Sequence, residues 1–354
     1  MIKVLVVDDS ILIRKILTDI LESDNEIKVI ETAKNGQDAL EKIQSLKPDL
    51  VTLDIEMPIM DGITTLKHIV SRYKLPVIMI SSLTSEGAEL TLKALDHGAV
   101  DFLPKPTNVF SLKQVDIRNQ IVEKVKVAAK AKFNTIKPIT KGEKPGITIE
   151  KKQDIEEKFK NIIAMGTSTG GPRALQALIP QLPANIDASI VIVQHMPPKF
   201  TKSLADRLNS VSNIRVKEAE EGDILLKGHA YIAPGDFHLR VVKEMDKLVI
   251  RLDQEPEVLG LRPTVDKMME SVAKIEGYEK IGVILTGMGS DGKKGIKSIK
   301  ESGGFTIAQD EVTSVVFGMP KAAISTNCID IVLPIEKIGD KILSKVGMKY
   351  GFRY

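Results

Sequence analysis

The sequence predicts an α/β protein of two domains, each built on a mainly parallel sheet. Short apolar runs alternate with segments of helical spacing in both halves of the chain, the pattern of strand–helix units. A chain of 354 residues is long for one core and sufficient for two. A lysine-rich stretch containing Pro138 and Pro145 separates the halves. It predicts a flexible linker over residues 123–158, between domains at 1–122 and 159–350.

The N-terminal domain is expected to hold five strand–helix units. Its expected helices include Ile11–Leu21 and Gly36–Leu46, where apolar residues recur at helical spacing. The expected strands are the apolar runs Ile2–Val7, Lys28–Ile30, Asp49–Leu53, Pro76–Ile80 and Val100–Leu103. Such regular alternation predicts a (βα)5 sheet with helices on both faces.

The C-terminal domain continues the alternation and adds one antiparallel element. Its expected strands are Ile162–Met165, Ser189–Val193, Ala230–Ala233 and Ile281–Leu285. Within His238–Leu252, two alternating runs flank a short polar turn, which predicts a β-hairpin. The domain is therefore expected to be doubly wound and mainly parallel, with one hairpin.

Composition excludes several classes of function. The formal net charge is only +3, and no basic stripe is present, which argues against a nucleic-acid partner. Cys328 is the only cysteine, so an intrachain disulfide is impossible and a reducing compartment is favoured. No apolar run reaches the ~18 residues of a membrane span, and Asp8 and Asp9 interrupt the stretch where a secretion signal would continue. We expect a cytoplasmic protein without membrane insertion, with a monomer as the default state.

Polar side chains directly follow four of the predicted N-terminal strands. Asp8 and Asp9 follow the first, Asp54 the third, Ser81 the fourth and Lys105 the fifth, and the carboxyl ends of parallel strands meet at one edge of a sheet. Three adjacent carboxylates repel one another unless a cation lies among them, and Mg²⁺ prefers such oxygen ligands. A metal-held carboxylate can then attack a phosphoryl donor while Lys and Ser hold the phosphate oxygens. Any one of the acids alone could equally be a helix N-cap.

A second group of polar residues follows predicted strands of the C-terminal domain. The run IIAM leads into GTSTG and then a helical segment, which predicts a turn that exposes Ser168 as a nucleophile. The N-terminus of the following helix offers N–H groups for an oxyanion. The alternative is a phosphate-binding loop, although the segment lacks both the Gly-Lys-Ser/Thr of a P-loop and G-x-G-x-x-G.

His195 and Asp291 are the expected partners of this serine. His195 follows the predicted strand at 189–193, whereas His229 precedes a strand and His238 opens the hairpin, which leaves His238 as the reserve base. Asp291 lies in the glycine-rich segment after the strand at 281–285 and could orient the base. By itself, Asp291 would be read as the N-cap of the next helix.

The motifs of the N-terminal domain, VLVVDDS, LDIEMPIMDG, PVIMISS and DFLPKP, resemble the receiver domain of two-component response regulators. The resemblance covers residues 1 to about 122 and implies a flavodoxin-like fold. The functional residues that it implies are Asp54 for phosphorylation, Asp8, Asp9 and Asp54 for Mg²⁺, and Ser81, Lys105 and Phe102 for the switch. Phe102 could equally be a core aromatic.

The motifs of the C-terminal domain, GTSTGGP, QHMPP, YIAPGDFHL, RPTVD, LTGMGSDG and AQDEVTSVVFGMP, resemble the chemotaxis protein-glutamate methylesterase family. The resemblance implies Ser168 as nucleophile, His195 as general base and then acid, and Asp291 as orienter. It also implies that Thr169 and Met288 line the site, with the Met288 N–H as oxyanion donor. The esterase reaction would need no cofactor.

The same resemblance implies the biological role. The substrates would be glutamate methyl esters, and certain glutamines, on methyl-accepting chemoreceptors, with release of methanol during adaptation. A chemotaxis histidine kinase would phosphorylate the receiver, which would otherwise inhibit the esterase. Two other classes were weighed: a transcription regulator, for which no helix-turn-helix pattern is present, and a non-catalytic ligand-binding module, which would not need His195 or Asp291.

Overall fold

The computed structural model describes residues 1–105, 115–131 and 158–348. The chain divides into two compact units, Met1–Phe133 and Asn134–Tyr354, and each is described by itself. None of the helices in the described ranges combines the length and apolar character needed to cross a bilayer.

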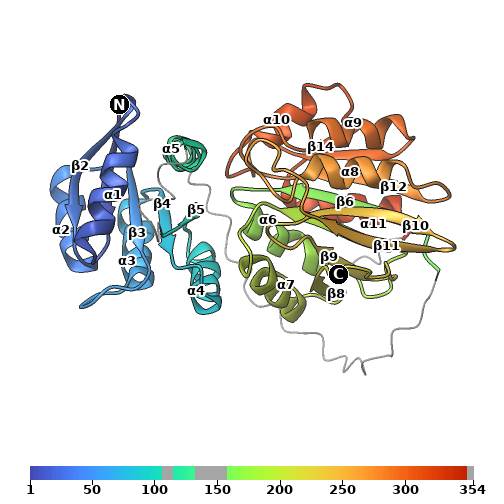
Figure 1. Cartoon of the computed structure of the whole chain (residues 1–354), viewed down its shortest axis with the longest axis horizontal. Coiled ribbons are helices and arrows are strands. Elements are labelled where there is room, and N and C mark those ends of the chain that lie inside the picture. Colours follow the sequence, from blue (N-terminus) through green and yellow to red (C-terminus); the bar gives the residue numbers. More distant parts are fainter. Residues whose placement is uncertain (106–114, 132–157, 349–354) are drawn as a thin grey trace, which may run out of the picture. The chain divides into compact units, whose positions relative to one another are not determined.

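The first unit is a five-stranded parallel sheet with strand order β2-β1-β3-β4-β5. Its strands are β1 Ile2–Val7, β2 Ile27–Ala33, β3 Leu50–Asp54, β4 Val77–Ser81 and β5 Asp101–Pro104. Its helices are α1 Ile11–Leu21, α2 Gly36–Leu46, α3 Gly62–His68 with the π-helical turn η1 Ile69–Tyr73, α4 Ser85–Asp96 and α5 Val115–Ala129. This is the predicted (βα)5 arrangement (Figure 1).

Burial explains why the central strands form. All five residues of β3 and of β4 are buried, as expected for strands covered by helices on both faces. The helices α1 and α5 pack together, and α3 packs against both α2 and α4. The carboxyl ends of β1 and β3, which lie side by side, carry Asp8 and Asp54 to one edge of the sheet.

The second unit is built on a seven-stranded parallel sheet with order β14-β13-β12-β6-β7-β9-β8. Its strands are β6 Asn161–Thr167, β7 Ala188–Gln194, β8 Arg215–Glu218, β9 His229–Ile232, β12 Glu279–Ile284, β13 Phe305–Gln309 and β14 Ile331–Leu333. Its helices are α6 Gly171–Leu178 with the 3₁₀ turn η3 Ile179–Gln181, α7 Phe200–Val211, α8 Val265–Ala273, α9 Lys293–Glu301, α10 Met319–Ile324 and α11 Ile335–Lys345. Figure 1 shows α8, α9 and α10 over one face of this sheet.

A separate antiparallel pair completes the unit. Strands β10 His238–Glu244 and β11 Lys247–Asp253 form the predicted hairpin. Its inward residues, such as Val241 and Ile250, are buried in the same core as α8. The doubly wound, mainly parallel class with one hairpin is therefore confirmed.

Three strands of the second unit escaped the sequence analysis. The strands β8 and β14 lie at the two edges of the sheet, where charged or half-exposed residues weaken the apolar pattern. The strand β13 follows two glycines and reads FTIAQ, in which Thr306 and Gln309 interrupt the apolar pattern.

The end of the first unit also differs from the expected linker. Helix α5 continues to Ala129, past residue 122, because Ile121, Val125 and Ala128 recur at helical spacing and are buried. The intervening lysines obscured that period in the sequence. Most of the predicted linker, residues 132–157, lies outside the described residues, as do residues 349–350 at the end of the predicted C-terminal domain.

Candidate active site

Ser168 stands at the carboxyl end of the central strand β6, in a tight turn that leads into α6. The Gly171 N–H donates to the Ser168 carbonyl at 2.8 Å, and Gly170 has φ +79° and ψ −5°, the values of the third residue of a type II turn. A residue with a side chain would be strained there. The turn leaves Ser168 half-buried, so its hydroxyl can be reached by a substrate.

His195 follows β7, the strand next to β6. Its N–H donates to the Thr167 carbonyl at 3.2 Å, which keeps it level with the serine turn. Its ring Nε2 lies 2.8 Å from Asp291 Oδ2. The His195 side chain is only 7% exposed, so little water competes for this bond.

Asp291 lies in the loop after β12, the other neighbour of β6. Its Oδ2 also accepts the Val265 N–H at 2.6 Å, and its Oδ1 accepts the N–H groups of Asp266 and Gly292 at 3.0 and 2.9 Å. Burial alone would raise the pKa of the Asp291 carboxyl, but the bond to His195 and these backbone donors outweigh it and lower that pKa below its ordinary value. Asp291 is therefore ionised at neutral pH.

The three residues thus converge from three adjacent strand ends. The structure joins His195 to Asp291 directly. The Ser168 N–H donates a hydrogen bond of 3.0 Å to the carbonyl of Thr286, which lies just after β12. Within the described ranges, the Ser168 hydroxyl itself makes no hydrogen bond. An ionised carboxylate, an imidazole and a reachable hydroxyl at one edge have the chemistry of acyl transfer.

The two predicted lining residues are the residue after Ser168, Thr169, and Met288 in the loop after β12. Thr169 is buried, and its carbonyl accepts the Thr286 hydroxyl at 2.9 Å. Met288 is half-exposed. The residue before it, Gly287, packs so closely on Ser168 that a Cβ at position 287 would lie 2.9 Å from the Ser168 Cβ. In the part of the chain that the structure describes, the Met288 N–H has no acceptor, so it could serve an oxyanion.

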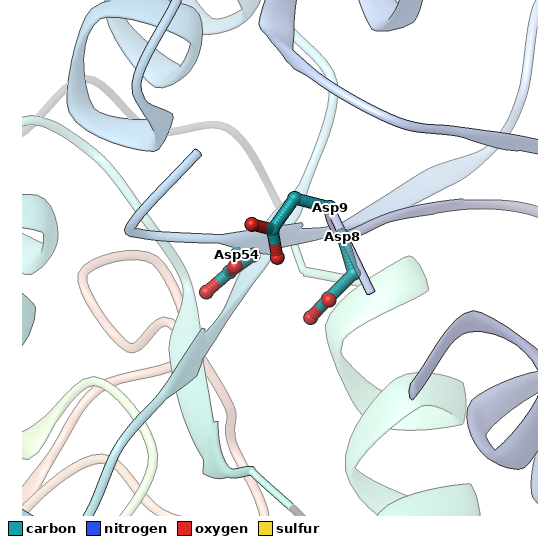
Figure 2. Close-up of side chains that lie close together, drawn as sticks. All are labelled: Asp8, Asp9 and Asp54. Atoms are coloured by element: carbon teal, nitrogen blue, oxygen red, sulfur yellow. The ribbon is translucent and has the colours of Figure 1, made fainter. Parts of the chain in front are cut away.

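The first unit carries an acidic pocket. Figure 2 shows Asp8, Asp9 and Asp54 at the ends of β1 and β3, and one carboxylate oxygen of each lies within 4.8 Å of the others. The Lys105 Nζ lies 2.7 Å from Asp54 Oδ2 and 3.6 Å from Asp8 Oδ2. Asp8 Oδ2 is buried and makes no hydrogen bond among the described residues. A buried oxygen of this kind beside two further carboxylates fits a Mg²⁺ ligand.

Burial makes Asp54 hard to ionise when no cation is bound. Desolvation raises the pKa of Asp54 to about 6, and the nearby Asp8 charge adds to that rise, while the hydrogen bond from Lys105 opposes it. Because Asp54 is 1% exposed, water cannot relieve the repulsion.

Of the other residues predicted for the switch, Ser81 is the last residue of β4 and Phe102 lies within β5. The Ser81 hydroxyl is buried and donates to the Gly87 carbonyl at 3.1 Å, while it accepts the Thr91 hydroxyl at 2.7 Å. Phe102 is 3% exposed, and the Lys124 Nζ lies 5.4 Å from its ring centroid. Phe102 is thus a packed core aromatic in this conformation.

Comparisons with known proteins relate each of the two units to a known family. The CheB methylesterase family model matches residues 163–342, and the response regulator receiver domain model matches residues 4–115. The protein-glutamate methylesterase/protein-glutamine glutaminase of Pyrococcus horikoshii is 47% identical over 98% of this chain and 94% of its own length. The chain belongs to the CheB methylesterase family.

Other members of the family give the same picture. The Bacillus subtilis protein-glutamate methylesterase/protein-glutamine glutaminase is 45% identical over 98% of this chain and 99% of its own. The crystal structure of the Thermotoga maritima CheB methylesterase catalytic domain is 49% identical, with a TM-score of 0.52, and covers 53% of this chain and 100% of that one. The family fold, a receiver followed by a methylesterase domain, is thereby established for this chain.

Sequence reasoning missed residues that hold the methylesterase site together. Gln194 is buried, and its Nε2 donates to the carbonyls of both Ser168 and His195 at 3.1 Å. Thr286 bonds to Thr169 and to Val316 through its hydroxyl. Gln194 is the last residue of the apolar strand β7 and directly precedes His195, and that position was the available signal; Thr286 lies just beyond β12, and no comparable signal marked it.

Proposed function

We propose that this chain is a phosphorylation-regulated serine hydrolase that converts glutamate γ-methyl esters of a protein substrate to glutamate and methanol. The observation that carries the proposal is the 2.8 Å bond between His195 Nε2 and Asp291 Oδ2 beside the reachable Ser168. Membership of the methylesterase family supplies the substrate class. A ligand-binding module would have no use for a buried carboxylate–imidazole pair at the end of the neighbouring strands.

The protonation states follow from the geometry. An ionised Asp291 can only accept hydrogen bonds, so His195 Nε2 carries the proton and Nδ1 is left with the free electron pair. In the proposed reaction, Nδ1 takes the Ser168 proton as the serine oxygen attacks the ester carbonyl carbon. The oxyanion forms near the Met288 N–H, and Thr169 lines the same site.

The intermediate then collapses in the ordinary way for acyl transfer. The bond to the methoxy oxygen breaks, His195 returns its proton to that oxygen, and methanol leaves an acyl-Ser168 ester. Water, deprotonated by His195, hydrolyses this ester to glutamate and free Ser168. A glutamine side chain would react by the same steps with ammonia as the leaving group, which matches the second activity in the relatives' names.

The test is methanol release from membranes that contain methylated chemoreceptors. Wild type should release methanol, and Ser168→Ala should be slower by about 10⁴-fold or more. Turnover by Ser168→Ala close to that of wild type would remove Ser168 from its role.

We further propose that Asp54 accepts a phosphoryl group from a chemotaxis histidine kinase and that this controls the esterase. Asp8, Asp9 and Asp54 would hold Mg²⁺, which would offset the negative charge of the transferring group. Lys105 and Ser81 would then bind the new phosphate oxygens. The substrate would be the cytoplasmic part of chemoreceptors, which places the reaction in the cytoplasm, and the single cysteine fits that compartment.

Control by the receiver is tested with a small phosphoryl donor and Mg²⁺. Both should raise methanol release by wild type and leave Asp54→Ala unchanged, since only Asp54 can accept the group. A fragment of residues 159–354 should be more active than the unphosphorylated full chain. Equal rates for the two would contradict inhibition by the receiver.

A further inference from the structure

At the N-termini of α8 and α9, an aspartate beside each helix accepts backbone N–H groups of the other helix. Helix α8 begins at Val265 and α9 at Lys293. Asp291, which precedes α9, accepts the first two N–H groups of α8. Asp266, in the first turn of α8, accepts the Gly295 N–H of α9 at 2.8 Å. Each helix is therefore capped by a carboxylate that belongs to the other.

Neither helix has another side chain that could take over this capping. The residue before α9 is Gly292, which has no side chain. The residue before α8 is Thr264, whose hydroxyl lies 3.4 Å from His238 Nδ1 and makes no capping bond. The unpaired N–H groups at a helix N-terminus need acceptors and favour negative charge. The exchanged carboxylates meet that need.

The two helices also approach too closely to adjust independently. A Cβ at Gly295 would lie 2.6 Å from the Met269 Cβ and 3.1 Å from the Asp266 Cα. Gly292 has φ +89°, and a Cβ there would lie 2.9 Å from a methyl group of Val265. A shift of α9 relative to α8 would therefore move the loop that carries Asp291.

Of the two exchanged carboxylates, only Asp291 contacts His195. Burial raises the pKa of the Asp266 carboxyl, and the charge of Asp291 raises it further, although the Gly295 N–H opposes both effects. The backbone N–H groups that donate to each carboxylate oppose the repulsion between the two acids. Asp266 thus contacts Asp291 through its backbone N–H and α9 through its carboxylate, without a contact to His195.

We propose that Asp266 is a positioning residue for hydrolysis: by capping α9 it fixes the loop from which Asp291 orients His195. The inference rests on the proposed function, because it needs Asp291 to serve the reaction. It assigns a role to an acid that neither touches His195 nor faces Ser168. Loss of the cap lets α9 and the Asp291 carboxylate drift, and displacements near 1 Å reduce rates by about 10²-fold.

The test compares Asp266→Ala with Asp266→Asn in the full chain. Asparagine keeps an oxygen that can accept the Gly295 N–H, whereas alanine removes it. We expect Asp266→Ala to lower kcat for methanol release by about 10- to 100-fold with KM within about twofold. Asp266→Asn should keep kcat within about threefold of wild type. The rate at which an alkyl fluorophosphonate labels Ser168 should follow kcat, and this readout needs no receptor substrate.

Asp223→Ala is the matched control. Asp223 also accepts a backbone N–H in this unit, that of Glu220 at 2.8 Å, but it lies between β8 and β9, at the edge of the sheet that β8 forms. Its loss should lower the melting temperature and leave kcat unchanged. If Asp266→Ala does not fold, Asp266→Ser, which is too short to reach the Gly295 N–H, takes its place in the same comparison.

Two results would overturn the inference. One is an unchanged kcat and labelling rate in folded Asp266→Ala or Asp266→Ser. The other is an Asp266→Asn enzyme as slow as the alanine variant, since the cap would then not be what matters. Full activity of Ser168→Ala in the same assay would instead remove the proposed function on which the inference rests.

Discussion

Replacing Asp291 by asparagine changes one oxygen to an NH₂ group and little else in shape. Asp291 accepts four hydrogen bonds, two at each oxygen: His195 and Val265 at Oδ2, Asp266 and Gly292 at Oδ1. Whichever way the amide is turned, its NH₂ group faces two N–H donors. No rotamer of asparagine in this position can satisfy all four donors.

The expected effect on rate follows from the imidazole. With the amide NH₂ toward His195, Nε2 must become the acceptor and Nδ1 the protonated atom, so the nitrogen proposed to accept the Ser168 proton is no longer a base. Loss of the correct tautomer in a serine–histidine–aspartate site lowers kcat by about 10⁴-fold, or about 5.5 kcal/mol of transition-state stabilisation. With the amide turned the other way, the backbone N–H groups of Asp266 and Gly292 lose their acceptor. Each loss should lower the free energy of unfolding by about 1–3 kcal/mol.

The assay is methanol release at saturating substrate, with urea unfolding of the same protein. Asp291→Asn should show a kcat lower by about 10³- to 10⁴-fold, an unchanged KM, and a free energy of unfolding lower by about 2–4 kcal/mol. The pKa of Asp291 lies below its ordinary value of 3.8. The stability that its ionised form contributes should thus persist above pH 4 and disappear only as pH falls below that value. A folded Asp291→Asn enzyme with kcat near wild type would show that Asp291 does not set the tautomer of His195.

Two further predictions concern the receiver pocket and the strand end beside the serine. The pKa of Asp54 is raised from 3.8 to about 6, so folding disfavours its ionised form, and receiver stability should fall as pH rises from about 4 to about 6. Without divalent cations, Asp54→Asn should stabilise the receiver transition in urea by up to about 3 kcal/mol at pH 7; an equal gain at pH 3.5 would contradict this. Gln194→Met keeps the shape of the side chain but removes both bonds to Ser168 and His195, and kcat should fall by about 10- to 100-fold. Gln181→Met, which removes one bond to α6, is the control, and equal kcat values for the two variants would exclude a special role for Gln194.

The parallel cores could be predicted from sequence because their signal is local. The runs that became β6 and β7 are wholly buried, and the last four residues of β1 and of β12 are buried, so each appears as an apolar segment between polar ones. The same burial predicted which polar residues would meet, because Ser168, His195 and Asp291 each follow such a run. Edge strands such as β14, with Val332 43% exposed, give no comparable pattern.

The supporting contacts of the site could not be predicted, because they depend on tertiary geometry. Asp266 and Gly295 are 29 residues apart, and nothing in the spacing indicates that α8 and α9 begin side by side. Gln194 has the composition of an ordinary polar strand end, and only the neighbouring positions of β6 and β7 reveal that it bridges two loops. The turn at Ser168 also differs from a strained serine elbow, since the left-handed residue is Gly170 and not the serine.

We propose Ser168 as the nucleophile and His195 as the base that activates it. The most direct measurement is mass spectrometry of the full chain after brief exposure to an alkyl fluorophosphonate, with digestion to locate the adduct. We expect one adduct per chain, on Ser168, that forms at least about 10²-fold more slowly in His195→Ala. An adduct at another residue, or an adduct rate at Ser168 that is independent of His195, would contradict it.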